Sequence, residues 1–261
     1  MKIKVHSWGG LGSQLFTLAV IYEITKKMPR RKIDLVHHTA GVTKRFFELE
    51  SMLNSKFNLK VVNDYKEIKN QTRNYKKRIL KKYLVIVVKF ILNVARLSIN
   101  LDTTPNLNRI KPWTLEVRGH YSKRHIENIF LDECIKYFNN YAVNTEGISD
   151  ALTVHYRLGD LLTITEKSYI DPHHVIESIA EVKKIYPLKR VIIYSDSVEE
   201  AKVKLEKIHD IFNVVNFMDS PTQSVIQSCI NSSFFLGTNS KVSIWIVKIR
   251  NHLGLQSKII E

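Results

Sequence analysis

The segment VHYRLGD, Val154 to Asp160, places a histidine, an arginine and an aspartate at the end of an apolar strand. Ligands of open α/β sheets bind where strands end, so this is a position for chemistry. An arginine there can bind a phosphate through two hydrogen bonds, and the aspartate can hold that arginine or accept a proton. We therefore take His155, Arg157 and Asp160 as candidate catalytic residues, with a surface ion pair as the alternative.

Two later strand ends carry small polar residues. The segment IIYSDS places Ser195 and Asp196 where an acidic residue commonly binds ribose hydroxyls in nucleotide-binding sheets. The segment GTNSKVSIW opens a helix, so Asn239, Ser240 and Ser243 lie where a diphosphate can rest on the helix dipole. Each of these residues can also be a helix cap. Three polar strand ends on one sheet edge nevertheless favour a nucleotide site.

A glycine-rich turn, GGLGSQLF, follows the first strand of the chain. Glycines at this position let backbone amides approach an anion or a sugar closely at a helix N-terminus. Gly10, Gly12 and Gln14 are therefore candidates for ligand binding. A tight strand-to-helix turn without a ligand is the alternative.

The elements that must position these residues alternate between strand and helix, which predicts parallel sheets. A chain of 261 residues is long enough for two packed cores. We predict an α/β fold with two Rossmann-like domains facing a cleft, residues 1–147 and 148–261. The first is expected to hold strands at 3–8, 32–38 and up to 119, with helices at about 13–27 and from Ser122. The second is expected to hold strands at 151–156, 190–197 and 233–238, with helices from 172, 198, 221 and 240.

The positive charge is concentrated in the first half of the chain. The net charge is +15, and residues 147–261 contribute none of it because their acidic and basic residues balance. The segment 56–96 holds 12 basic and 2 acidic residues, which favours phosphates of an anionic membrane or of nucleic acid. Lys89 interrupts the apolar run in 82–101, which suits a basic amphipathic helix on lipid better than a membrane span. A core helix or a strand is the alternative. No RNA motif, zinc module or helix-turn-helix accompanies the charge, so nucleic acid is the weaker partner.

The cysteines and paired histidines predict neither a disulfide nor a metal site. Cys134 and Cys229 are isolated in the sequence, and we expect both to be core thiols in a reducing compartment. The pairs His37–His38 and His173–His174 lack carboxylate partners at ligand spacing, so we expect surface histidines. The N-terminus lacks the apolar stretch of a signal peptide, and the expected location is the cytoplasm.

Taken in order, the motifs resemble those of the bacterial α-1,2-fucosyltransferases, glycosyltransferase family 11. That family has GGLGNQLFQYA, HxRRGD, an FSDD-like strand end and NSxFSWW. This chain has GGLGSQLFTLA, HYRLGD, YSDS and NSKVSIW in the same order. Its GHYSKRHI segment is also similar to the family's GYWQSEKYF-like stretch. The resemblance covers nearly the whole chain except the basic middle, and the first motif is the most specific.

The resemblance implies a GT-B enzyme that transfers L-fucose from GDP-fucose with inversion, without a metal or another cofactor. By position, Arg157 is expected to bind the donor diphosphate, and Asp160 is expected to support the motif. The nucleotide side is expected to be lined by Ser195, Asp196, Asn239, Ser240 and Ser243, and the first-domain side of the cleft by Gly10, Gly12 and Gln14. The expected acceptor is a lipid-linked surface polysaccharide, O-antigen or capsule, with the galactose 2-hydroxyl as the first candidate. The enzyme is then expected at the inner face of the cytoplasmic membrane.

Three positions depart from the family pattern. Leu158 replaces the second arginine of HxRRGD, Ser13 replaces an asparagine, and Ile244 replaces the first tryptophan of FSWW. These changes weaken the donor assignment more than the fold, so another nucleotide sugar on the same fold is the alternative. A rival alignment places the last motif on residues 231–235, but it breaks a strand.

Chemistry alone leads to a similar mechanism. Transfer of a sugar from a nucleotide develops negative charge on the departing diphosphate, and the sequence has no DxD motif to hold a metal there. An arginine and helix N-termini can stabilise that charge instead. The acceptor hydroxyl attacks the opposite face of the sugar with help from a general base, for which Asp160, His6 and Glu116 are candidates.

Overall fold

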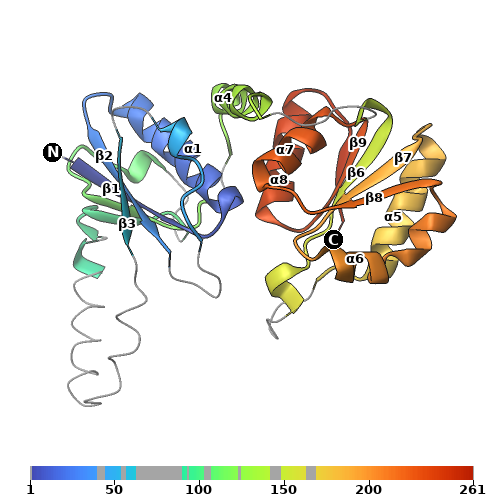
Figure 1. The fold of residues 1–261 in the computed structure, drawn as a ribbon. Helices are drawn as coiled ribbons and strands as arrows, with labels where there is room; N and C mark the ends of the chain where they lie inside the picture. The colour runs from blue at the N-terminus through green and yellow to red at the C-terminus, as the bar shows by residue number, and fades with distance from the viewer. Residues whose placement is uncertain are drawn as a thin grey trace, which may run out of the picture. The chain divides into compact units, whose positions relative to one another are not determined.

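The structure, a computed structural model, forms two compact units, Met1–Glu127 and Asn128–Glu261. Each unit is built on one five-stranded parallel sheet (Figure 1). The predicted α/β fold with two parallel sheets is therefore confirmed. The structure describes residues 2–39, 45–53, 57–62, 90–92, 94–102, 107–122, 125–141, 148–162 and 169–260.

The first unit has the strand order β3-β2-β1-β5-β4. Its elements are β1 (Lys2–Trp8), α1 (Leu11–Lys27), β2 (Lys32–His38), β3 (Phe57–Val62), β4 (Ser98–Asn100) and β5 (Glu116–Arg118). Side chains of β1 alternate between the two faces of the sheet. The Thr17 hydroxyl of α1 donates to Ser7 at 3.3 Å, so Ser7 and the buried Val5 lie on the α1 face. The exposed Lys4 lies on the opposite face.

A glycine makes the tight entry into α1 possible. Gly9 has a φ of 80°, a conformation that favours glycine, and it turns the chain from β1 into α1 within two residues. At the other end of the helix, Lys26 and Lys27 complement the negative end of the helix dipole. Most of the intervening helix is buried, which fixes α1 against the sheet.

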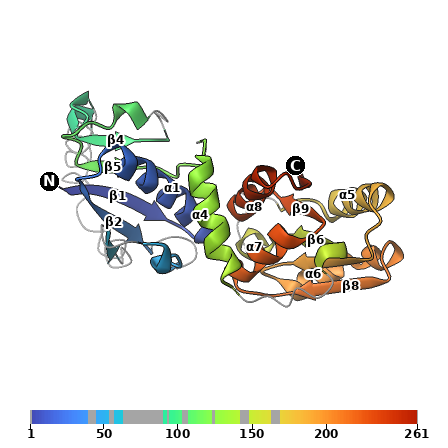
Figure 2. The same cartoon turned by 90° about the horizontal axis from the view of Figure 1, so that it is seen from above.

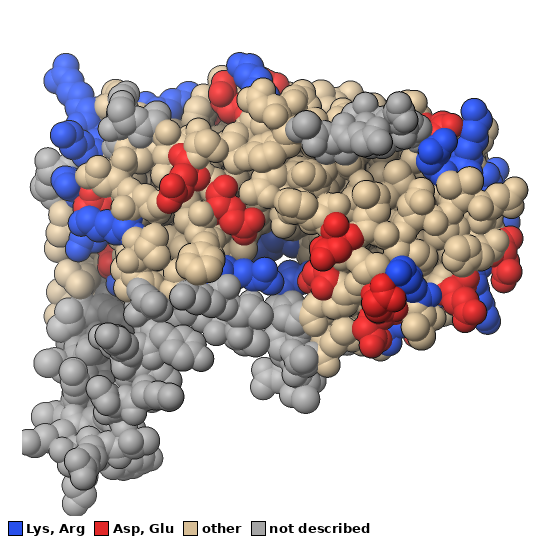
Figure 3. All heavy atoms as spheres, viewed as in Figure 1, with Lys and Arg blue, Asp and Glu red and all other residues tan. Residues whose placement is uncertain are grey.

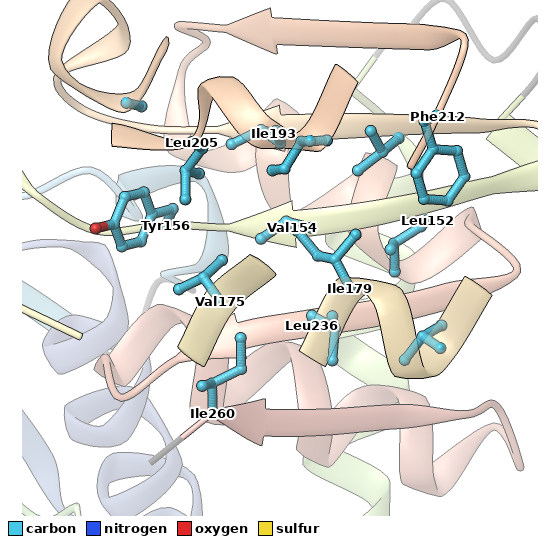
Figure 4. Packing of buried hydrophobic residues seen from close by; sticks show 14 of the residues in the cluster. Leu152, Val154, Tyr156, Val175, Ile179, Ile193, Leu205, Phe212, Leu236 and Ile260 are labelled. Atoms are coloured by element: carbon cyan, nitrogen blue, oxygen red, sulfur yellow. The ribbon is translucent and has the colours of Figure 1, made fainter. Parts of the chain in front are cut away.

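The second unit has the strand order β10-β9-β6-β7-β8. Its elements are α4 (Asn128–Asn139), β6 (Ala151–His155), α5 (Pro172–Ile185), β7 (Arg190–Tyr194), α6 (Val198–Lys204), β8 (Val214–Met218), α7 (Thr222–Asn231), β9 (Phe234–Thr238), α8 (Lys241–His252) and β10 (Ser257–Ile260). Figure 4 shows the core on one face of this sheet, where Leu152 and Val154 of β6 meet Val175 and Ile179 of α5. The other face carries α7 and α8, which contact β9.

Helix α4 belongs to the second unit, although the sequence analysis placed residues up to 147 in the first domain. It packs against α7 and α8, as Figure 2 shows from above. The contact has a specific core: Phe130 meets the fully buried Trp245 edge-on, with ring centroids 6.0 Å apart. The units therefore divide between Glu127 and Asn128.

Several elements differ from the sequence-based expectation. The helix expected from Ser122 begins only at Asn128, and strands β3, β4, β8 and β10 were not predicted. Both cysteines are buried free thiols, as expected. His37, expected at the surface, is fully buried, and its ring contacts the Ser7 hydroxyl at 3.3 Å and the Arg45 carbonyl at 3.0 Å.

The basic segment 56–96 lies mostly outside the described residues. Within the described part of the chain, no helix has the length and apolar character that a membrane crossing requires. On the face of the second unit seen in Figure 3, acidic and basic side chains are interspersed, in keeping with the balanced charge of residues 147–261.

Candidate functional site

The sheet order of the second unit marks one place for a ligand. From β6 the chain proceeds to β7 and β8 on one side, then crosses back to β9 and β10 on the other. The order therefore reverses between β6 and β9, and crevices at such switch points, at the carboxyl ends of the strands, bind ligands in open α/β sheets. His155 ends β6 and Thr238 ends β9, so the predicted residues 155–157 and 239–243 come together at this point.

A chain of hydrogen bonds joins the start of α8 to His155. The Ser243 amide donates to Ser240 Oγ at 3.1 Å, which makes Ser240 the helix N-cap. The Ser240 hydroxyl donates to Ser243 Oγ at 3.0 Å, and Ser243 Oγ lies 2.8 Å from His155 Nδ1. Ser240 Oγ also lies 3.3 Å from His155 Nδ1, so two serine hydroxyls face this ring nitrogen. We therefore assign Nδ1 as the acceptor and the ring proton to Nε2.

Burial is the main reason why His155 is neutral. It lowers the pKa of the His155 imidazole from 6.5 to about 4; the Asp196 carboxylate opposes this shift, and the nearby Arg157 adds to it. A second proton on Nδ1 would remove the acceptor for Ser243. At neutral pH, His155 therefore positions the start of α8 as an uncharged group.

Gly237 allows α8 to start close to the sheet. A Cβ on Gly237 would lie 2.6 Å from Ser243 Cβ and 2.8 Å from Ser243 Oγ, closer than real side chains approach. The absence of a side chain brings the helix N-terminus against β9. The first backbone amides of a helix carry partial positive charge and can bind an anion.

Thr238 holds the backbone of Arg157, and sequence reasoning did not single it out. The Arg157 amide donates to Thr238 Oγ1 at 3.1 Å, and the Thr238 hydroxyl donates to the His155 carbonyl at 3.1 Å. Thr238 is buried, whereas Arg157 is half-buried. The threonine directly before the predicted Asn239–Ser240 pair was the available signal for this contact.

Asp196 supports the loop after β6. The Leu158 amide donates to Asp196 Oδ1 at 2.9 Å. A Cβ on Gly159 would lie 2.5 Å from Asp196 Cγ, so the glycine lets the loop pass the carboxylate. The side chain of Asp160 lies outside the described residues. Leu158 itself is fully buried in the core of the second unit.

The two remaining predicted residues of this edge have different environments. Ser195 is buried, and its hydroxyl accepts from the Ser197 amide at 3.2 Å next to the start of α6. Asn239 is exposed directly before the N-cap of α8. Asn239 and the half-buried Arg157 therefore offer side chains at the switch point, whereas Ser195 serves the local turn.

In the first unit, Gln14 is a structural residue of the turn after β1. Its amide nitrogen donates to the carbonyls of Gly9 at 3.0 Å and Phe46 at 2.7 Å. Its amide oxygen accepts from the Glu48 amide at 2.7 Å. The side chain is fully buried, so it joins residues 46–48 to the glycine-rich turn. Gly10 is the N-cap of α1, and Gly12 is buried within that helix.

The described residues contain no group of three histidine, cysteine or acidic side chains placed to hold a metal ion. At the second-unit edge, the groups with the charge and polarity to bind an anion are the amides at the start of α8 and the Arg157 side chain after β6. This arrangement can bind a diphosphate and stabilise negative charge on it.

No protein-family model and no curated protein sequence matches the chain. It is similar to E. coli heptosyltransferase WaaC with ADP, at 10% identity and a TM-score of 0.52, over 99% of this chain and 92% of that one. WaaC with ADP-2-deoxy-2-fluoro heptose matches at 10% identity and a TM-score of 0.50, over 95% and 86%. These matches show a GT-B fold. POFUT1 in complex with GDP-fucose matches at 11% identity and a TM-score of 0.49, over 99% and 97%.

Proposed function

We propose that this chain is an inverting glycosyltransferase that moves L-fucose from GDP-fucose to a hydroxyl of a surface polysaccharide. The observation that carries the proposal is the β6–β9 switch point, where Thr238 joins the backbone of residues 155–157 to the end of β9, just before the N-terminus of α8. The GT-B fold supports a nucleotide-sugar donor. The choice of fucose rests on the order of the GGLGSQLF, HYRLGD, YSDS and NSKVSIW motifs.

In this mechanism the donor diphosphate lies on the first amides of α8 and pairs with the Arg157 guanidinium. Negative charge grows on the diphosphate as the bond to the sugar breaks, and both groups stabilise that charge. His155 remains uncharged and holds Ser243, so the helix start keeps its geometry through the reaction. The acceptor hydroxyl attacks the opposite face of the sugar, which inverts the anomeric configuration.

One observation favours another nucleotide sugar as the donor. Leu158 stands where the family has its second arginine, and its side chain is fully buried in the core. The position therefore offers a diphosphate only its backbone, and the amide is already bonded to Asp196. A donor that needs one arginine at this edge fits the chain as well as GDP-fucose does.

A direct test is to incubate the purified protein with labelled GDP-fucose and lactose, which ends in galactose. We expect fucosylated lactose, and we expect Arg157→Ala to abolish its formation. A panel of GDP-, UDP- and ADP-sugars, ranked by thermal shift, addresses the alternative donor. If the panel selects another nucleotide sugar and GDP-fucose does not bind, the donor assignment is wrong and the glycosyltransferase assignment stands.

We also propose that the acceptor is lipid-linked and that the protein binds the inner face of the cytoplasmic membrane. The excess positive charge of the first half supports this, and so do the exposed apolar side chains of Phe90, Ile91, Val94 and Trp113. We expect cosedimentation with vesicles that contain anionic phosphatidylglycerol and none with neutral vesicles. Equal recovery with both kinds of vesicle would contradict the electrostatic part of this proposal.

A further inference from the structure

The first sheet has a switch point of its own, at the carboxyl ends of β1 and β5. The chain proceeds from β1 to β2 and β3 on one side, whereas β4 and β5 lie on the other, so the strand order reverses between β1 and β5. Ligands of open α/β sheets bind at such points. Trp8 is the last residue of β1, and His120 lies just after the end of β5, so both residues are at this place.

The loop that carries His120 has an unusual backbone. Gly119 and Tyr121, on either side of His120, have φ values of 138° and 58°, and a positive φ is rare for a residue such as tyrosine. Asp102, which follows β4, holds this loop, because its Oδ1 accepts from the amides of His120 at 2.7 Å and Tyr121 at 3.3 Å. Backbones of this kind persist only where the surrounding structure fixes them, and they cluster at ligand sites.

Tyr121 ties the same loop to both strands of the switch point. Its side chain is buried, and its hydroxyl lies 2.9 Å from the carbonyl oxygen of His6 on β1 and 3.2 Å from that of Val117 on β5. His120, in contrast, is exposed. The loop therefore fixes the position of His120 through its backbone and leaves the imidazole at the surface.

The exposed imidazole lies beside an aromatic surface. The rings of His120 and Trp8 have centroids 6.2 Å apart and an interplanar angle of 56°. Trp8 is half-buried, and its ring is held by stacking on His38, with centroids 4.8 Å apart and an interplanar angle of 8°. Trp8 thus offers the remaining part of a fixed indole ring next to His120.

Polar side chains of β5 lie on the same face of the sheet as Trp8, as the pairing of β1 with β5 shows. Arg118 donates to Glu116 Oε1 at 2.7 Å, and His6 Nε2 lies 2.7 Å from the same oxygen. The hydrogen bond with His6 and the pair with Arg118 hold the pKa of the Glu116 carboxyl well below its usual range, although burial opposes this shift. The Arg118 side chain is 43% exposed, so this ion pair is open to a ligand.

An aromatic ring beside groups that donate and accept hydrogen bonds is suited to a sugar. The C–H surface of a pyranose packs on an aromatic ring, and its hydroxyls exchange hydrogen bonds with imidazole, carboxylate and guanidinium groups. We propose that the acceptor galactoside binds at the β1–β5 switch point, with its ring on Trp8 and a hydroxyl bonded to His120. This inference rests on the proposed function, which requires a sugar acceptor. It places the acceptor away from the contacts of the buried Gln14, which are taken up by the backbone of its own unit.

The test compares His120→Ala with His174→Ala, a control at an exposed histidine of α5. Lactose binding is measured by saturation-transfer NMR titration, with and without GDP, and the KM for lactose is measured in the transfer assay. Because the loop is held through its backbone, we expect His120→Ala to keep the fold and to raise both the Kd and the KM for lactose about tenfold. The Kd for GDP-fucose should stay within about twofold, and the control should behave as the wild type does.

Two variants of Trp8 provide an independent readout. Trp8→Phe keeps an aromatic ring, so its lactose affinity should stay within about threefold of wild type, whereas Trp8→Leu should bind lactose about tenfold more weakly. Urea titrations of both variants show whether the fold is retained.

The outcomes separate this inference from the proposed function. Lactose affinity of His120→Ala within twofold of wild type, or equal affinities of Trp8→Phe and Trp8→Leu, would overturn the site alone. A wild type that binds no lactose, with or without GDP, would overturn it as well. If the wild type binds lactose but transfers no fucose, the donor assignment is wrong, and lactose binding by the variants still decides the site.

Discussion

The environment of His155 makes stability depend on pH in a way that one substitution can isolate. The pKa of His155 falls from 6.5 to about 4 on folding. Between pH 4 and 6.5, the unfolded chain therefore binds a proton at this residue more readily than the native protein does. The stability attributable to this residue is thus complete above pH 6.5 and is lost as the pH falls toward 4. At about 1.4 kcal/mol per pKa unit, the full loss is about 3 kcal/mol, with about 2 kcal/mol already lost at pH 5.

The assay is urea denaturation at pH 7.5 and pH 5 for the wild type, His155→Asn and the control His174→Asn. The Oδ1 of asparagine can accept from the Ser243 hydroxyl as Nδ1 does, and asparagine does not titrate. When the pH is lowered from 7.5 to 5, we expect the free energy of unfolding of the wild type and of the control to fall by about 2 kcal/mol more than that of His155→Asn. Equal losses in all three proteins would refute the assignment of His155 as neutral in the native protein.

Two further substitutions test the second unit. Arg250 is fully buried, and its guanidinium donates to the backbone carbonyls of residues 229, 230, 232, 233 and 256. Arg250→Met leaves these carbonyls without donors, so it should lower the free energy of unfolding, measured by urea titration, by about 3 kcal/mol or more. A loss below about 1 kcal/mol would contradict this role for Arg250. Gly159→Ala places a methyl group against Asp196 and should weaken GDP binding by about tenfold or more in calorimetry. The double variant Gly159→Ala/Asp196→Ala removes the clash, so its loss of GDP affinity should be smaller than the sum of the losses in the two single variants. If the double variant loses as much affinity as that sum, the clash is not the cause.

The parts of the fold that were predicted from the sequence have strong local signals. Buried runs such as those of β6, β7 and β9 stand out because both faces of a parallel strand are covered. Pro172 at the first turn of α5 and Ser240 at the N-cap of α8 also mark their helices locally. β3 has the apolar–polar alternation of a half-exposed edge strand at Asn58 and Lys60, but it was missed because it is six residues long and lies in the basic segment, which has no clear period overall.

The site was only partly predictable, because its decisive contacts are long-range. The sequence placed Ser195 and Asp196 together at one strand end, but it could not show that Asp196 bonds the Leu158 amide 38 residues away. Likewise, Gln14 belongs to a motif that suggested ligand binding, yet all its polar atoms bond the backbone of its own unit. A motif identifies which residues matter, and the fold decides whether a given side chain meets the ligand or supports the loop that does.

The central claim is that fixed positive charge and helix amides at the β6–β9 edge bind the diphosphate. The most direct measurement is calorimetric titration of GDP into the protein with EDTA present, for the wild type and for Arg157→Ala. We predict undiminished binding by the wild type and at least a tenfold weaker Kd for the variant. Wild-type binding that disappears with EDTA and returns with Mn²⁺, or a variant that binds as tightly as the wild type, would contradict the account.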